Sequence, residues 1–484
     1  MRKKFEQQYS IDIIPISEVK IENNKRDELP PILQGLQHIF VTPELNQEIF
    51  KILSAKIIKG KKTGRPGMDL WHILVLGVIR MGLDTNYDRL LDLSNNHKLI
   101  RKIMGVEKDF GQGLEFAYTT IRENVSLLDE STIDEVNAIV VKTGHKIVKK
   151  KEEKLKVKAD TYTLETNVHF PTDINLLWDA GRKCLDIIIN LAKEHKIEDW
   201  RKVKLWYRNL KNQARNLSKA CQSGGKNKVR KEKEEAEKYL YIAKALNEKI
   251  HLSNKAGWVG LNPADALVSM IQIDYFQGML IKHIDLVERR LINGETIPAK
   301  EKIYSIFEPH SEWIQKGKAN NKVEIGHNIL VVSDQFHFIL YHKIVEHEAD
   351  VKLAVPMAEE LTRIYGLGAF HSCSFDKGFW KKENKVDLQP FFEKVILPKK
   401  GKKNKAEQEE ESSKEFKKLR HKHSAVESNI NSLEHHGLNR CPDKGLKNFK
   451  KYAALGVLAY NLHRLGIALI CEQEKAANKL RRAA

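Results

Sequence analysis

The spacing of apolar residues changes from a helical to a strand-like period near residue 155, and this change most constrains the fold. Upstream, from Thr42 to about residue 150, apolar residues recur at helical intervals, as at Leu45 and Ile49. Residues 155–160 instead alternate apolar and polar side chains, which is typical of a strand with one buried face. Long blocks of both periods in one chain predict an α/β protein.

Beyond residue 160 the two periods alternate again. A helical pattern returns at about 173–295, and the chain closes with helices expected at about 413–435 and 446–475. Strand-like runs occur at 301–307, 322–332, 336–343, 370–376 and 394–397. Residues 398–412, a Lys-rich block followed by a Glu-rich one, are predicted to form a mobile loop.

The charge of the chain points to a polyanionic partner. Its 484 residues include 83 Lys and Arg against 64 Asp and Glu, a formal charge of +19. Lys and Arg that neutralise phosphates release condensed counterions, which favours nucleic-acid binding. Charged and polar residues interrupt the longest apolar runs, so we expect no membrane span, and the scattered cysteines suggest a reducing cytosol.

A strongly basic region lies within the helical pattern at about 173–295. Residues 201–231 carry many Lys and Arg and no acid, among them Lys204, Arg208, Lys211 and Arg215. With Trp206 and Tyr207 nearby, this segment could bind a nucleic-acid backbone. A solvated helical hairpin with a basic outer face is the alternative interpretation.

Three acids occupy positions that local structure alone does not explain. Asp160 is expected at the end of a strand, and Asp376 follows the apolar run 369–375. Glu427 lies on a helix that is expected to bury Val426, Ile430 and Leu433, while His423 and Asn431 share its polar face. Two strand ends and a facing helix can bring such side chains together.

Hard oxygen ligands of this kind suit Mg²⁺ or Mn²⁺ better than zinc. Two such ions can activate an attacking oxygen and stabilise a leaving one in phosphoryl transfer. We therefore expect Asp160, Asp376 and Glu427 to be both the catalytic and the metal-binding residues, with two ions.

Three runs carry a resemblance to a known family. They are 158–173, with Glu-Thr-Asn-Val-His-Phe-Pro-Thr-Asp at 165–173, the turn Phe-Asp-Lys-Gly-Phe at 375–379, and 420–431. Together they resemble bacterial insertion-sequence transposases of the DDE type (ISNCY-like), which have an RNase H-like catalytic domain. The resemblance covers roughly residues 42–465, and it matches Asp160 and Asp376 to the family aspartates and Glu427 to the glutamate.

The match also has departures. Many relatives carry Tyr-x2-Arg-x3-Glu-x6-Lys around the glutamate, whereas this chain has Arg420, His423, Glu427 and Glu434 at those positions. The resemblance implies DNA contacts from Arg420 and His423. We also expect DNA contacts from Arg65, in the basic loop 59–66, and from Lys377.

The expected architecture is an RNase H-like mixed sheet, largely antiparallel and flanked by helices. Its predicted parts are an N-terminal arm at 1–41, a helical DNA-binding domain at 42–150, a catalytic domain at 151–475 with a helical basic insertion at about 173–295, and a C-terminal tail at 476–484. A helix-turn-helix reader is one precedent for 42–150. A dimerisation or scaffold unit is the alternative there.

The expected function is metal-dependent strand cleavage at element ends and, by the resemblance, strand transfer into target DNA. Double-stranded DNA is the expected partner, bound by a homodimer in the active complex, in the cytoplasm at the bacterial nucleoid. Two alternatives remain open. One is a metal-dependent nuclease without strand transfer, and the other is a DNA-binding protein without catalysis.

Other polar residues favour structural roles. Asp334 precedes a further apolar run and is expected in a hairpin turn. Asp173 and Asp179 are expected to cap helices, and His435 and His436, before Gly437, to end one.

Overall fold

The computed structural model describes residues 5–7, 12–57, 67–108, 113–195, 200–255, 263–315 and 323–483. The chain forms a mixed α/β structure with two compact units. One unit comprises Met1–Asn167 and Ile314–Ala484, and the other comprises Val168–Trp313. Each is described separately below.

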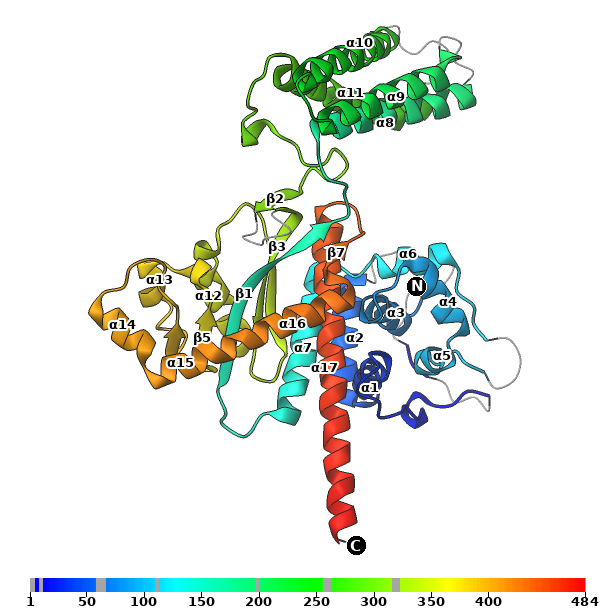
Figure 1. The fold of residues 1–484 in the computed structure, drawn as a ribbon. Coiled ribbons are helices and arrows are strands. Elements are labelled where there is room, and N and C mark those ends of the chain that lie inside the picture. The colour runs from blue at the N-terminus through cyan, green and yellow to red at the C-terminus, as the bar shows by residue number, and fades with distance from the viewer. Residues whose placement is uncertain are drawn as a thin grey trace. The chain divides into compact units, whose positions relative to one another are not determined.

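The larger unit, called here the sheet unit, is built on a mixed sheet (Figure 1). Its strands are β1 Leu155–Thr166, β2 Glu312–Gln315, β3 Val323–Ser333, β4 Ile339–Val345, β5 Phe370–Phe375, β6 Lys394–Ile396 and β7 Arg440–Cys441. β1 pairs antiparallel with β3 and parallel with β5, and β3 pairs antiparallel with β4. β5 also pairs parallel with β6, so the sheet is less antiparallel than the sequence analysis expected.

Helices surround this sheet. Those before β1 are α1 Leu29–Val41, α2 Pro43–Ile57, α3 Leu70–Gly82, α4 Tyr87–Asn96, α5 Lys98–Met104, α6 Tyr118–Val125 and α7 Glu130–Val148. Those after β4 are α12 Ala354–Tyr365, α13 Lys382–Asp387, α14 Lys405–Ser412, α15 Lys414–His421, α16 Ala425–Leu433 and α17 Leu446–Ala483. Short turns include η5 Asp350–Lys352, η6 Lys377–Phe379, η7 Lys422–Ser424 and η8 Glu434–Leu438.

The N-terminal arm expected at 1–41 contains a buried helix, so that prediction was wrong for residues 29–41. α1 carries Pro30 and Pro31 in its first turn, where backbone N–H groups have no intrahelical acceptor and proline removes no bond. α1 and α17 approach each other closely at two glycines. A Cβ added to Gly35 of α1 would lie 2.7 Å from Leu462 O of α17, and one added to Gly466 of α17 would lie 1.8 Å from Pro31 O of α1.

The helices before β1 share one hydrophobic core with the sheet. The amide of Asn461 on α17 joins three elements, because Nδ2 donates to Asn137 Oδ1 of α7 and to Ile339 O of β4, both at 2.8 Å. The boundary expected at residue 150 therefore does not separate compact units.

The second unit, called here the helical unit, contains α8 Asp173–His195, α9 Val203–Gln222, α10 Lys228–Lys255 and α11 Pro263–Val287. These helices bury their own apolar cluster, including Leu177, Tyr239 and Leu246. Thr172 Oγ1 accepts from Asn175 N at the start of α8. Asp179 lies inside α8 rather than at its cap, where it contacts Arg182 and His169.

Two local predictions fail because side-chain capping decides the local structure. Residues 302–307 form no strand; Ser305 Oγ accepts from the N–H groups of Phe307 and Glu308, and Ile306 is buried in the helical core. The loop expected at 398–412 contains α14, which begins with a capping box between Asn404 and Glu407.

The C-terminal helix α17 is the one described helix that is long and apolar enough to cross a membrane by length and composition. Its apolar window is 72% buried within the protein, as in the core helix of a soluble protein. In Figure 1 it runs beside α7 and α1, and both helices contact it.

Candidate acidic site

Asp160 lies in the middle of β1 and not at its end, which corrects the sequence prediction. Its backbone is opposite Val331 of β3, so β1 continues as a regular strand on that side. On the other side, β5 ends at Phe375, which is paired with Ala159. Asp160 is thus placed at the point where the neighbouring strand stops.

Asp376 follows β5 directly and lies beside Asp160. Adjacent strands are about 4.8 Å apart, and residues in register across a parallel pair share a face of the sheet. Arg420 of α15 holds Asp376 in place, donating from Nη2 to Asp376 Oδ1 at 3.1 Å and from Nη1 to Phe375 O at 2.6 Å. Arg420 therefore positions an acid in addition to being a candidate DNA contact.

Glu427 belongs to α16, which contacts β1 and β3 and crosses in front of β1 in Figure 1. Its side chain is exposed, as is that of Asn431, while Val426 and Leu433 are fully buried. The polar and apolar sides of the helix agree with the expected pattern at these positions, and Ile430 is half-buried.

His423 differs from its expected role as a cationic DNA contact. Its side chain is only 7% exposed, and burial, helped by the charge of Arg420, lowers its pKa to about 4. The imidazole is therefore neutral near pH 7 and lies inside the protein, next to the acids.

The structure adds a fourth acid, Asp350, which the sequence analysis missed. Asp350 is in η5 after β4 and accepts a hydrogen bond from Thr161 Oγ1 of β1 at 3.2 Å. A Cβ at Gly378, two residues after Asp376, would lie 2.9 Å from Asp350 Oδ2. No local pattern marks Asp350, because only the path of the chain after β4 brings it here.

Electrostatics show that these acids influence one another. Burial raises the pKa of Asp160 to about 6; a hydrogen bond from Thr161 N opposes this, and the charges of Asp376, Asp350 and Glu427 add to it. Partial burial also opposes ionisation of Asp376, but the Lys377 N–H and Arg420 outweigh it and lower the pKa of that carboxyl. The two aspartates thus differ in their affinity for protons.

This donor set fits a divalent cation in its chemistry. All four groups are carboxylates, the ligands that Mg²⁺ and Mn²⁺ prefer. A nearby cation would offset both the burial of the Asp160 carboxylate and the repulsion from its neighbours, which together raise its pKa. In the part of the chain that the structure describes, no three Asp, Glu, His or Cys side chains are already spaced to hold one ion. One oxygen of Asp376 is bonded to Arg420.

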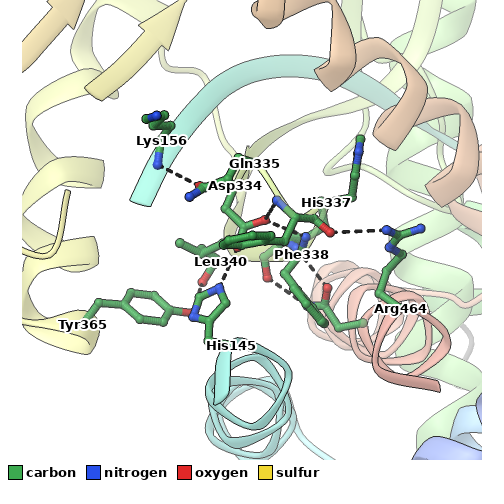
Figure 2. A network of polar contacts seen from close by, with 12 residues as sticks. His145, Lys156, Asp334, Gln335, His337, Phe338, Leu340, Tyr365 and Arg464 are labelled. Atoms are coloured by element: carbon green, nitrogen blue, oxygen red, sulfur yellow. Dashed lines mark hydrogen bonds and ion pairs between the residues drawn. The ribbon is translucent and has the colours of Figure 1, made fainter. Parts of the chain in front are cut away.

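Asp334 has a structural role, as expected, at the turn between β3 and β4 (Figure 2). It is fully buried; its Oδ1 accepts from the N–H groups of Phe336 and Phe338, and its Oδ2 lies 2.6 Å from His145 Nε2. Gly437, with φ +81°, likewise follows His435 and His436 where their helix ends, as expected.

The remaining expected DNA contacts fall in different places. Arg65 lies outside the described residues, and Lys377 is exposed beside Asp376. On α9 of the helical unit, Lys204, Arg208 and Arg215 are exposed and Lys211 is half-buried. Their intervals of three and four residues place them on one stripe of the helix, which we call the α9 stripe.

The aromatic residues beside this stripe belong partly to the core. Trp206 and Tyr207 pack against the helical cluster, and the Tyr207 ring lies 5.1 Å from that of Trp178.

Comparison with models of protein families, with curated proteins and with solved structures finds no match to this chain.

Proposed function

We propose that this protein is a DDE-type transposase that cuts DNA at element ends and joins the freed ends to target DNA. The observation that carries the proposal is the grouping of Asp160, Asp376 and Glu427 from three distant segments. Burial is the main cause of the raised pKa of Asp160, and the charges of Asp376 and Glu427 add to it. Perturbed carboxylates grouped in this way are typical of functional sites.

The sheet agrees with the RNase H-like interpretation. Its central strand β1 carries Asp160, the parallel strand β5 leads into Asp376, and a flanking helix supplies Glu427. In the chain, the helical unit lies between β1 and β2 of this sheet, where the sequence analysis expected a basic insertion, and it is somewhat longer than expected.

In the proposed reaction, the three acids would hold two Mg²⁺ or Mn²⁺ ions, which supply acidification of an attacking oxygen and charge stabilisation of a leaving oxygen. Water attacks a phosphodiester, the P–O3′ bond breaks, and a 3′-hydroxyl and a 5′-phosphate result. The 3′-hydroxyl then attacks a phosphodiester of the target. Arg420 keeps Asp376 ionised and oriented throughout.

The test uses linear duplex DNA carrying the sequences that flank the gene, labelled at the 5′ end of the strand whose 3′-hydroxyl is freed by the cut. We expect cleavage with Mg²⁺ or Mn²⁺, none with EDTA, and a slower product in which the labelled strand is joined to a second duplex. Cleavage without joining would instead identify a nuclease. Binding without cleavage would identify a DNA-binding protein.

A further inference from the structure

A small basic cavity lies beside the acidic site, on the same face of the sheet. Its volume is about 210 Å³, and its lining includes Lys156 and Lys158 of β1, Ser372 and Ser374 of β5, and Lys422 of η7. β1 and β5 pair Lys156 with Ser372 and Lys158 with Ser374, so these four side chains form two cross-strand pairs on one face. We call this cavity the lysine pocket.

The lysine pocket gathers positive charge in its lining. None of the described residues that line it is Asp or Glu. Lys158 is 7% exposed, and its Nζ donates to one carbonyl, Asp334 O, at 3.1 Å. An ammonium group carries three donors, so Lys158 retains others. Lys422 lines the same cavity, so a second cation lies beside Lys158.

A hydroxyl group adds to this donor set. Ser374 is 4% exposed, and its Oγ has no hydrogen-bond partner within the described residues. A buried hydroxyl without a partner is unfavourable. Lysine ammonium groups that converge with a hydroxyl are suited to an oxyanion with several acceptor oxygens, and lysine is a common phosphate ligand.

The wall of the lysine pocket is preformed by the turn between β3 and β4 (Figure 2). Gln335 Oε1 accepts from Lys156 N at 2.8 Å, and His337 also lines the pocket. His337 has φ +70°, a conformation that favours glycine. It is held there because its ring Nδ1 lies 2.9 Å from Asn429 Oδ1 and its carbonyl accepts from the Tyr460 hydroxyl. Such strain persists where the surrounding structure imposes it, often at binding sites.

The position of the pocket relates it to the acids. Lys158 is two residues before Asp160 on β1, and Ser374 is two residues before Asp376 on β5. Two residues of a strand span about 7 Å, so donors for an anion lie next to acceptors for a cation along both strands. A DNA strand that presents one phosphate to the acids would bring a neighbouring phosphate to the lysines.

We propose that the lysine pocket binds a phosphate group. The phosphate group belongs either to a phosphodiester of DNA or to free phosphate. Only the first of these alternatives rests on the proposed function. Lys156, Lys158 and Lys422 supply the charge, and Ser374 supplies a further donor.

The experiment compares Lys422→Gln with Lys417→Gln in the full-length protein, with EDTA present so that no cleavage occurs. Both residues are exposed, and Lys417 is on the adjacent helix α15 but does not line the pocket. One arm measures inorganic phosphate binding by calorimetry at constant ionic strength. The other arm measures binding of a DNA duplex by fluorescence anisotropy across a range of salt concentrations.

We expect Lys422→Gln to weaken phosphate binding about tenfold, since a hydrogen bond to a charged group contributes on that scale. In the DNA arm we expect the log–log salt slope to fall by about 0.9, the value for one neutralised phosphate. Lys417→Gln should match the wild type in the phosphate arm and keep the DNA slope. Ser374→Ala, a small change that keeps every charge, should weaken phosphate binding in the same direction.

The outcomes separate the two sources and the two proposals. A response in the DNA arm identifies a phosphodiester as occupant, and a response in the phosphate arm alone identifies free phosphate. If the protein binds phosphate through Lys422 but never cleaves DNA, the proposal for the lysine pocket is supported and the proposed function is contradicted. If Lys422→Gln and Lys417→Gln have the same phosphate affinity and the same salt slope of DNA binding, the proposal that the lysine pocket binds phosphate is wrong.

Discussion

The acidic site of the sheet unit and the α9 stripe of the helical unit carry charges of opposite sign. They also differ in whether their residues come from distant segments or from one segment of the chain. The acids come from β1, η5, the end of β5 and α16, which are far apart in the sequence. The stripe comes from a single helix, in which residues three and four apart are neighbours. Folding can therefore force like charges together at one site, while a helix places them side by side without tertiary contacts.

The two regions also differ in how strongly their charges interact. Burial and neighbouring acids raise the pKa of Asp160 to about 6. The cations of the stripe are largely exposed to solvent, where salt screens interactions beyond about 10 Å at 0.1 M. Changes at the acidic site should therefore alter chemistry and stability, and changes at the stripe should alter only binding.

The largest expected effect is the loss of cleavage in Asp160→Asn. A neutral amide is a poorer ligand for a hard cation, and losing several kcal/mol of charge stabilisation slows a reaction by on the order of 10³-fold or more. Single-turnover cleavage with Mg²⁺ measures this. Asp387→Asn, an exposed acid at the end of α13, is the matched control and should cleave at the wild-type rate. Normal cleavage by Asp160→Asn would remove this residue from the site.

The next largest effect is expected from placing a charge on the buried side of α16. Val426 is fully buried, so Val426→Asp places an unpaired charge in the core and should destabilise the sheet unit by about 3–5 kcal/mol. Its neighbour Glu427 is exposed, so Glu427→Gln should melt near the wild type while losing cleavage. Urea unfolding and cleavage assays on both variants test the orientation of the helix. Reversed stabilities would place Glu427 in the core and Val426 outside it.

A smaller effect follows from the raised pKa of Asp160. Below pH 3.8, its ordinary pKa, the carboxyl is protonated in both the folded and the unfolded chain. Between pH 3.8 and about 6 the unfolded chain loses this proton while the folded chain keeps it, so the folded state is progressively destabilised. This unfavourable contribution should reach about 2–3 kcal/mol above pH 6. Asp160→Asn should therefore stabilise the protein at pH 8 and have little effect near pH 4 in urea unfolding with EDTA. Equal effects at both pH values would contradict the raised pKa.

The smallest expected effect concerns the α9 stripe. Changing Lys204, Arg208, Lys211 and Arg215 to Gln should leave folding intact and reduce the salt slope of DNA binding by about 0.9 for each phosphate that the variant no longer neutralises. The matched control removes four cations of α10, namely Lys228, Arg230, Lys238 and Lys244, which are paired with acids. A slope that changes equally in both variants would show that the α9 stripe has no special role.

The sequence predicted secondary structure best where apolar residues follow a long, regular period. β3 to β6 and the helix α2 lie where periodicity placed them. α17 begins where expected but continues to Ala483, so the tail expected at 476–484 is helical over its described residues. α1 was missed because Pro30 and Pro31 suggest a break, although proline is compatible with the first turn of a helix. α14 was missed because its ends depend on a capping box and not on an apolar face.

The sequence alone determined which residues carry the relevant charges and which faces of helices and strands are apolar, because these properties follow from residue type and from periods of 3.6 and 2. Tertiary structure decided that Asp160 lies mid-strand beside the end of β5, that Asp350 joins it, and that His423 is buried and neutral. It also placed Lys422 beside Lys158. The reason is physical: proximity between distant segments, and the pKa shifts that it causes, depend on strand pairing and packing, which no local period encodes.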